Sequence, residues 1–125
     1  MDKLSIVIVN YNAGEYLINC LTSIINNRSE ADIDIYVVDN ASVDDSIAQA
    51  KKLKFPINFI LNDKNLGFGA ANNIALKQIT SEFILILNPD TEIYKGTIKT
   101  VIDFMKDNDN VGAATCEVIL PNNQV

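Results

Sequence analysis

The sequence predicts an α/β fold with a mostly parallel β-sheet and helices on both of its faces, and three observations support this prediction. Short apolar segments rich in β-branched residues alternate with longer segments whose apolar residues recur at helical spacing. The short segments are nearly continuously apolar, which is typical of strands covered on both faces. The chain has 125 residues, 48% of them hydrophobic, so residues 1–125 are expected to form a single domain with its own core.

The elements follow one another in the order strand, helix, strand, helix, which is the pattern of βαβ units in a parallel sheet. Apolar runs predict strands at residues 4–9, 34–39, 57–62, 82–88 and 111–120. Helical spacing of Leu, Ile, Val, Met and Ala predicts helices at residues 12–27, 42–53, 67–79 and 96–107.

Two of these helices begin with residues at capping-box spacing. Asn12 precedes the first helix with Glu15 three residues later, and Ser42 opens the second with Asp45 three residues later. These pairs predict side-chain caps at the two helix starts. Asp44 and Asp45 would also favour the start of the second helix through its dipole.

Composition excludes several kinds of chemistry. The chain has no histidine, so Ser-His-Asp, Cys-His and His-metal sites are ruled out. The net charge of −6 argues against a nucleic-acid partner, because proteins that bind nucleic acids carry basic patches. Cys20 and Cys116 are each flanked by apolar residues and are expected to be buried free thiols.

No apolar run approaches the ~18–20 residues of a membrane span, so no transmembrane segment is predicted. The N-terminal run "MDKLSIVIVN" reads as a strand, since it has one lysine and no small-residue cleavage site. The cytoplasm is the expected location, with a peripheral position at the inner face of the membrane as the alternative.

Polar residues follow each of the first four strands, where ligands bind in open parallel α/β sheets. The four loops carry Asn10 to Asn12, Asp39 to Ala41, Asn62 to Gly67, and Asn88 to Asp90. They are expected to meet along one edge of the sheet. Asp39 and Asp90 are expected to end adjacent elements of that edge.

Common phosphate-binding motifs are missing. There is no G-x-G-x-x-G after the first strand and no G-x-x-x-x-G-K-[ST], and the short "GFG" at residues 67–69 is a weak signal alone. These absences argue against a dinucleotide dehydrogenase and a P-loop enzyme. A phospho-receiver domain would need an acidic pair after the first strand, where this chain has "NYN".

Four segments in this order and at this spacing carry a family resemblance: "IVIVNYN", "VVDNASVDDS", "NLGFGAANN" and "ILILNPDTEI". Together they resemble family 2 of the glycosyltransferases, and most closely its rhamnosyltransferase-like branch. The resemblance covers the whole chain. It implies the GT-A fold, a Rossmann-like domain that binds nucleotide-diphospho-sugars.

The resemblance also implies roles for single residues. The Val9–Asn12 backbone and the Tyr11 ring would line the base pocket, and Asp39 would accept hydrogen bonds from the pyrimidine or its ribose. Asn65 and Gly67 would lie beside the nucleotide and its diphosphate. The residues assigned to nucleotide binding are Val9, Asn10, Tyr11, Asn12, Asp39, Asn40, Asn65, Gly67 and Asn72.

The Asn88–Asp90 segment occupies the place of the family's D-x-D motif, and Asp90 matches its metal-ligating acid. The implied cofactor is Mg²⁺ or Mn²⁺, which would bridge the phosphates and so let an acidic protein hold a diphosphate. Two departures stand out. Asn88 replaces the first acid and is a neutral oxygen ligand, and Asn72 stands where many relatives carry an arginine. The "ANN" form resembles members that use deoxythymidine-diphosphate sugars.

The resemblance implies an inverting glycosyltransferase that moves a sugar from a UDP- or dTDP-sugar to a glycan or lipid-linked acceptor. Its catalytic base is expected beyond Val125, which leaves the catalytic residue unknown. A module that binds a sugar nucleotide without turning it over is the main alternative, and a receiver-like signalling domain is a third. For single residues the plainer alternatives are turns at Asp90 and Asn65 and a helix cap at Asp39.

Overall fold

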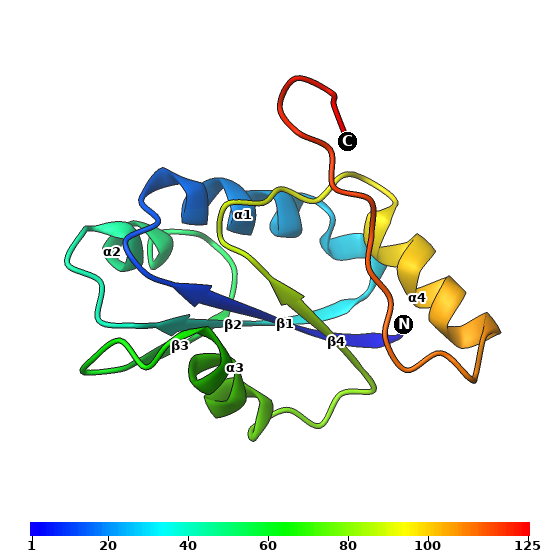
Figure 1. The fold of residues 1–125 in the computed structure, drawn as a ribbon, viewed down its shortest axis with the longest axis horizontal. Coiled ribbons are helices and arrows are strands. Elements are labelled where there is room, and N and C mark those ends of the chain that lie inside the picture. Colours follow the sequence, from blue (N-terminus) through cyan, green and yellow to red (C-terminus); the bar gives the residue numbers. More distant parts are fainter.

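The computed structural model describes all residues from Met1 to Val125 and contains one four-stranded parallel sheet (Figure 1). The strands are β1 (Lys3–Asn10), β2 (Asp32–Asp39), β3 (Ile57–Leu61) and β4 (Phe83–Leu87). The helices are α1 (Glu15–Asn26), α2 (Ser46–Ala50), α3 (Phe68–Leu76) and α4 (Thr97–Asp107), with a 3₁₀ turn, η1 (Arg28–Glu30), after α1. The predicted α/β class with a parallel sheet is confirmed.

The strand order is β3-β2-β1-β4, so β1 lies between β2 and β4. Asp39 and Asp90 therefore do not follow adjacent strands, and that prediction was wrong. With neighbouring strands about 4.8 Å apart, the axes of β2 and β4 lie roughly 10 Å apart. Alternation along the chain predicts parallel strands, but it leaves open on which side of β1 each later strand is added.

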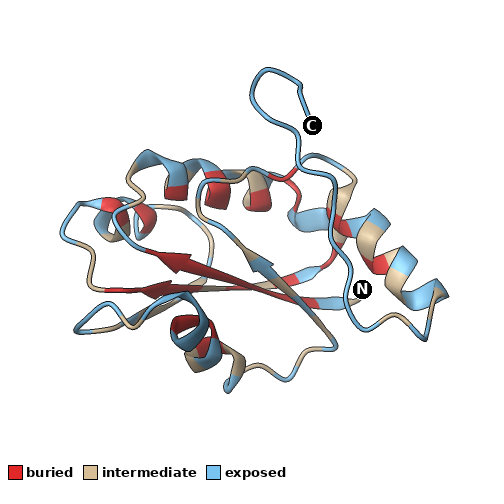
Figure 2. Cartoon of the chain, viewed as in Figure 1, coloured by how far each residue is buried: buried red, intermediate tan, exposed pale blue.

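Two apolar cores lie on opposite faces of the sheet, because successive side chains of a strand point to opposite faces. The larger core joins Ile6 and Ile8 of β1 to buried residues of α1, α2 and α4. The smaller one joins Val7 and Val9 to Ala71 and Ala75 of α3. Figure 2 shows the burial concentrated in β1, β2 and the inward sides of the helices. The predicted helical stripes are thus core, and both faces carry helices.

The predicted helix caps were wrong. α1 begins at Glu15 after Gly14, and α2 begins at Ser46 after Asp45, and neither cap residue makes a side-chain capping bond. α2 is also only five residues long, shorter than the predicted 42–53 helix. Asn12 and Ser42 instead bond to each other's loops, as described below, and a side chain used in that way cannot cap its own helix.

The start of α4 is capped from a distant part of the chain. The Glu30 carboxylate accepts hydrogen bonds from the backbone N–H groups of Gly96 (2.9 Å) and Lys99 (3.1 Å). A carboxylate at this position satisfies unpaired N–H groups and favours the positive end of the helix.

β4 forms an open edge of the sheet, and the predicted fifth strand at 111–120 is absent. Residues 112–120 are exposed and irregular, and none of their backbone groups is bonded to β4. A strand requires a hydrogen-bonded neighbour, so an apolar pattern without one does not form a strand. Cys116 lies in this segment and is exposed, which contradicts its predicted burial, whereas Cys20 is buried as predicted.

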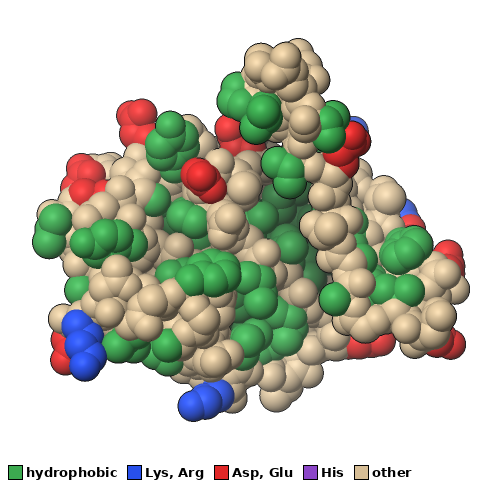
Figure 3. All heavy atoms as spheres, in the orientation of Figure 1, with side chains coloured by type: hydrophobic (Ala, Val, Ile, Leu, Met, Phe, Trp, Pro, Cys, Tyr) green, Lys and Arg blue, Asp and Glu red, His purple; other side chains and the backbone are tan.

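One face of β4 is also uncovered. Ile84 and Ile86 are 43% and 48% exposed, because they lie on the side of α3 while α3 packs over β1 and β2. Figure 3 shows hydrophobic side chains gathered in this part of the surface and a hollow between the body and the C-terminal segment. Continuous coverage, predicted for all strands, therefore holds for β1 and β2 but not for β4.

None of the helices combines the length and the apolar character that a membrane crossing requires.

Candidate functional site

The four polar loops predicted to lie together do follow the carboxyl ends of neighbouring parallel strands, here called the carboxyl edge (Figure 1). Asn10 and Asp39 are register partners at the ends of β1 and β2, and Asp39 is paired with Leu61 of β3. β4 ends at Leu87, opposite Ile8, directly before Asn88. The parallel topology thus brings together residues that are up to 80 positions apart in the chain.

Asp39 is held by donors on both of its carboxylate oxygens. Its Oδ1 accepts hydrogen bonds from Asn10 Nδ2 (2.9 Å) and Ser42 Oγ (2.6 Å), and its Oδ2 accepts one from the Ser42 backbone N–H (3.0 Å). Only 6% of Asp39 is exposed. The carboxylate is therefore fixed in one orientation without any basic partner.

A second carboxylate is tied into the same set of bonds. Asn10 Nδ2 also donates to Ser46 Oγ (2.9 Å), and Ser46 Oγ donates to Asp44 Oδ1 (2.6 Å). Asp44 Oδ2 accepts from the Gly14 backbone N–H (3.0 Å). The hydrogen bond from the Ser46 hydroxyl, with backbone N–H bonds from Ser46 and Gly14, lowers the pKa of the Asp44 carboxyl. We call Asn10, Asn12, Asp39, Ser42, Asp44 and Ser46 the polar network.

Asn12 completes the polar network from the loop after β1. Its Oδ1 accepts from the Val43 backbone N–H (2.8 Å), and its own N–H donates to Ser42 Oγ (2.9 Å). It adopts a left-handed backbone with φ of 50°. Tyr11 lies between the two bonded asparagines and remains 54% exposed. The Asn12 side chain therefore joins two loops, while the Tyr11 ring is available to a ligand.

The loop after β3 is held by Asn40. Its Oδ1 accepts from Asn62 Nδ2 (3.1 Å) and the Leu66 backbone N–H (3.3 Å), and its Nδ2 donates to the Gly67 carbonyl (3.2 Å). Asn65 accepts from the Gly67 N–H (2.9 Å) and so shapes a turn. Gly67 has φ of 82°, which favours glycine at the start of α3.

Two buried amide oxygens have no hydrogen-bond partner, and both belong to residues assigned to nucleotide binding: Asn10 Oδ1 and Asn72 Oδ1. Asn72 is 4% exposed, and its Nδ2 donates to the Phe68 carbonyl (3.0 Å). An unsatisfied buried acceptor is costly.

The loop after β4 differs, because its polar side chains make no hydrogen bonds to the other three loops. The Asn88 carbonyl accepts from the Thr91 hydroxyl (2.7 Å) and, weakly, from Cys20 Sγ (3.8 Å). The side chains of Asn88 and Asp90 are exposed and unbonded. Burial raises the pKa of the Cys20 thiol beneath this loop to about 12, with further contributions from the charges of Asp90 and Glu92. Cys20 therefore stays protonated at neutral pH and supports the loop by packing.

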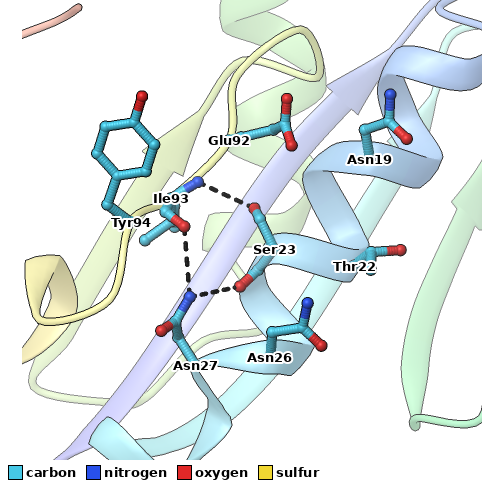
Figure 4. A pocket seen from close by; sticks show the side chains of 8 residues that line it. All are labelled: Asn19, Thr22, Ser23, Asn26, Asn27, Glu92, Ile93 and Tyr94. Atoms are coloured by element: carbon cyan, nitrogen blue, oxygen red, sulfur yellow. Dashed lines mark hydrogen bonds between the residues drawn. The ribbon is translucent and has the colours of Figure 1, made fainter.

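Further along, the same loop is fastened to α1, as Figure 4 shows. The Ile93 N–H donates to Ser23 Oγ (2.9 Å), and Asn27 Nδ2 donates to the carbonyls of Ser23 (2.8 Å) and Ile93 (3.3 Å). A hollow of about 260 Å³ lies above these bonds and is lined mainly by polar side chains. The bonds anchor the loop at Ile93, three residues beyond Asp90.

Charges at the carboxyl edge are not compensated by bases. All four ion pairs lie elsewhere, around Lys3, on α4 and between Lys106 and Asp2. No group of three or more Cys, Asp or Glu side chains is placed to hold a metal by itself. Asn88 and Asp90 nevertheless supply the hard oxygen atoms that Mg²⁺ and Mn²⁺ use when phosphates and water complete the coordination. The donor set thus fits a cation shared with a phosphate ligand.

Comparison with known families decides the class of this domain. Residues 5–120 match the family described as Glycosyl transferase family 2. The chain belongs to glycosyltransferase family 2. The domain therefore has the GT-A fold expected from its motifs.

Relatives with similar sequences are much longer than this family 2 domain. A teichoic acid poly(glycerol phosphate) polymerase of Staphylococcus epidermidis is 32% identical over 119 residues, which are 89% of this chain and 16% of the polymerase. The poly(ribitol-phosphate) beta-N-acetylglucosaminyltransferase TarS of Staphylococcus aureus is 29% identical over 112 residues, which are 86% of this chain and 20% of TarS.

Solved structures of S. aureus TarS share the fold. The complex of TarS with UDP-GlcNAc has a TM-score of 0.73 and 28% sequence identity, over 86% of this chain and 32% of that one. The complex with UDP has a TM-score of 0.76 at 24% identity, over 98% of this chain and 43% of that one. A structural neighbour of this family 2 domain therefore binds a nucleotide-sugar.

The structure brings together most of the site residues that sequence reasoning selected, but it adds others that were missed. In the sequence, Ser42 and Asp44 were interpreted only as helix-start residues, and Ser46 was not singled out. The position of Ser42, three residues after Asp39, could have indicated their contact. In turns, Asp side chains often accept hydrogen bonds from backbone N–H groups a few residues later in the chain. No sequence signal links Asp44 to Gly14.

Proposed function

We propose that this family 2 domain binds a nucleotide-diphospho-sugar at its carboxyl edge and serves an inverting transfer of the sugar to a hydroxyl of a glycan or lipid-linked acceptor. The observation that carries the proposal is the pairing of a buried, fixed carboxylate (Asp39) with an exposed, unbonded one (Asp90) at one sheet edge of a family 2 domain.

The β1 and β2 ends are suited to the nucleoside. Tyr11 presents a half-exposed ring on which a pyrimidine can stack. Asp39 has two oxygens with about four acceptor positions, of which the protein uses three, so one remains for an N–H or O–H of the base or ribose. The partnerless oxygens of Asn10 and Asn72 are buried and are not open to a nucleoside in this conformation.

The β4 end is suited to the diphosphate through a cation. Asp90, with Asn88, would hold Mg²⁺ or Mn²⁺ beside the phosphates, and the cation would offset the charge of the nucleoside diphosphate as it leaves. Asn88 contributes a neutral oxygen, so Asp90 supplies the only protein charge in this pair. The anchoring of the following loop on α1 keeps Asp90 from moving away from the edge.

We propose a pyrimidine nucleotide-sugar as the donor. The TarS complexes favour a UDP-sugar, and the "ANN" form at Asn72 favours a dTDP-sugar of the rhamnosyltransferase-like branch. No carboxylate of this chain is assigned as the catalytic base, since Glu117 lies in the exposed irregular segment. A sugar-nucleotide-binding module without turnover is therefore the second candidate. A cytoplasmic location stays a prediction from the sequence.

Thermal unfolding with a panel of UDP-, GDP- and dTDP-sugars, each with and without Mn²⁺, tests donor binding. A ligand present at about 100 times its dissociation constant should add roughly 2.7 kcal/mol of stability. We expect a gain with a pyrimidine nucleotide-sugar that depends on Mn²⁺. No gain with any member of the panel would refute the proposal. Release of nucleoside diphosphate in the presence of acceptor separates the enzyme from the binding module.

A further inference from the structure

We infer that Ser42 is a positioning residue of the nucleoside site, whose hydroxyl sets the orientation of Asp39 and the course of the loop that carries Tyr11. This inference rests on the proposed function, since it assumes that Asp39 and Tyr11 face a nucleoside.

The Ser42 hydroxyl bonds both to Asp39 and to the loop that carries Tyr11. Its single proton goes to Asp39 Oδ1 at 2.6 Å, the shorter of the two contacts at that oxygen. A lone pair of Ser42 Oγ accepts from the Asn12 backbone N–H (2.9 Å). Asn10 Nδ2 lies 3.2 Å from the same oxygen, but its two protons have closer acceptors in Asp39 Oδ1 and Ser46 Oγ, each at 2.9 Å.

The direction of these bonds follows from the chemistry of Asp39. An ionised carboxylate only accepts hydrogen bonds, so the Ser42 proton must point toward it, and its lone pairs must face the β1 loop. The bond is charge-assisted and hence among the stronger ones in the site. The Ser42 N–H adds a second bond to Asp39 Oδ2 at 3.0 Å. Rotation of the carboxylate would break both.

The same hydroxyl determines where Tyr11 lies. Asn10 and Asn12 flank Tyr11; the Asn12 N–H donates to Ser42 Oγ, and the Asn10 amide nitrogen lies 3.2 Å from that oxygen. Asn12 has a left-handed backbone, which is uncommon outside glycine and needs support from its surroundings. Loss of the hydroxyl would remove one of the three hydrogen bonds to the Asp39 carboxylate and the bond from the Asn12 N–H, and so loosen both the carboxylate and the Tyr11 segment. It would leave the Asn88–Asp90 turn unchanged, because that turn has no bond to Ser42.

The test measures binding of uridine and thymidine separately from binding of Mn²⁺-pyrophosphate, by calorimetry on the full chain. For Ser42→Ala we expect an about tenfold loss of affinity for the bound nucleoside, or about 1.4 kcal/mol. Affinity for Mn²⁺-pyrophosphate should be unchanged. Ser42→Thr, which keeps the hydroxyl, should bind nucleoside like the wild type. Ser81→Ala is the matched control, because the Ser81 hydroxyl bonds to Ser5 away from the carboxyl edge.

An unchanged nucleoside affinity in Ser42→Ala overturns the inference. A parallel loss of nucleoside and Mn²⁺-pyrophosphate also overturns it, since that pattern indicates a general structural role, as does an equal loss in Ser42→Thr. If Ser42→Ala does not fold, Ser42→Cys replaces it, because a thiol of similar size is a weak hydrogen-bond donor. Wild-type protein that binds neither nucleoside nor nucleotide-sugar would refute the proposed function itself and this inference with it.

Discussion

The two ends of the carboxyl edge are built differently, although each carries an aspartate close to the end of a strand: Asp39 is the last residue of β2, and Asp90 is the third residue after β4. At the ends of β1 and β2, Asp39 is 6% exposed and accepts three hydrogen bonds within the polar network. At the end of β4, Asp90 is exposed and its side chain accepts none.

This difference indicates that one end of the edge is organised before a ligand binds and the other end only when it binds. The polar network fixes its groups before a ligand arrives, which lowers the entropic cost of binding. At the β4 end the Asp90 carboxylate is instead solvated in the free protein, so it adds little to the free energy of folding and is ordered only when a cation and phosphates bind. Removing a network residue should therefore change the stability of the free protein, whereas removing Asp90 should change only its response to a ligand.

The largest effect is expected for Asp90→Asn. This change should abolish the Mn²⁺-dependent gain of roughly 2.7 kcal/mol that a saturating nucleotide provides at about 100 times its dissociation constant. The free protein should change by no more than about 0.5 kcal/mol, because the side chain makes no internal bond. Thermal unfolding of the same variant, with and without Mn²⁺-nucleotide, measures both. Glu92→Gln, two residues away, is the matched control.

A structural role of Asp90 would give a different pattern. If Asp90 is a turn residue, its replacement lowers the stability of the free protein by about 1 kcal/mol and leaves the ligand response intact.

A second prediction concerns the stability of the network end. Asn10→Ala should lower the free energy of unfolding by about 1.5–3 kcal/mol, because Asn10 is fully buried and its amide donates to the Asp39 carboxylate. Asn88→Ala at the β4 end should cost less than about 0.5 kcal/mol. Urea unfolding of the two variants makes the comparison. Equal losses at the two asparagines would show that the two ends are equally organised.

The smallest effect is a dependence of the free energy of unfolding on pH, which we expect from the polar network and not from the β4 end. Asp44 has a lowered pKa in the folded protein, chiefly because of the Ser46 hydroxyl, and an ordinary pKa of about 3.9 when unfolded. Below about pH 5 the unfolded chain binds more protons at this site, so the stability that Asp44 provides is present at neutral pH and is lost as the pH falls through the folded pKa.

Urea unfolding between about pH 2 and pH 6 measures how the free energy of unfolding changes with pH. Asp44→Asn should weaken the fall in stability on acidification, and Asp45→Asn, whose carboxylate bonds only to the exposed Gln49 side chain, should not. The same slope for both variants and the wild type would contradict the assignment.

Sequence reasoning located the candidate site better than it located the bonds within it. The loops after the strands were identified correctly, because strand and helix periodicity is a local property of the chain. Asn12 and Ser42 were read as helix caps, since the same side chains satisfy either a local cap or a distant loop. Only the register of Asn10 with Asp39 brings the two loops within 3 Å of each other, as the 2.9 Å bond from the Asn12 N–H to Ser42 Oγ shows.

The sequence by itself determined the α/β class, the parallel direction of the strands and the edge at which the polar residues gather, because each follows from the alternation of strand and helix. Tertiary structure decided the strand order, the open edge at β4 and the irregular state of residues 112–120. It also decided which of two similar aspartates is fixed and which is exposed. The physical reason is that these outcomes depend on partners: a strand needs a neighbour, and a buried carboxylate needs donors, one of which, Asn10, lies 29 positions away in the chain.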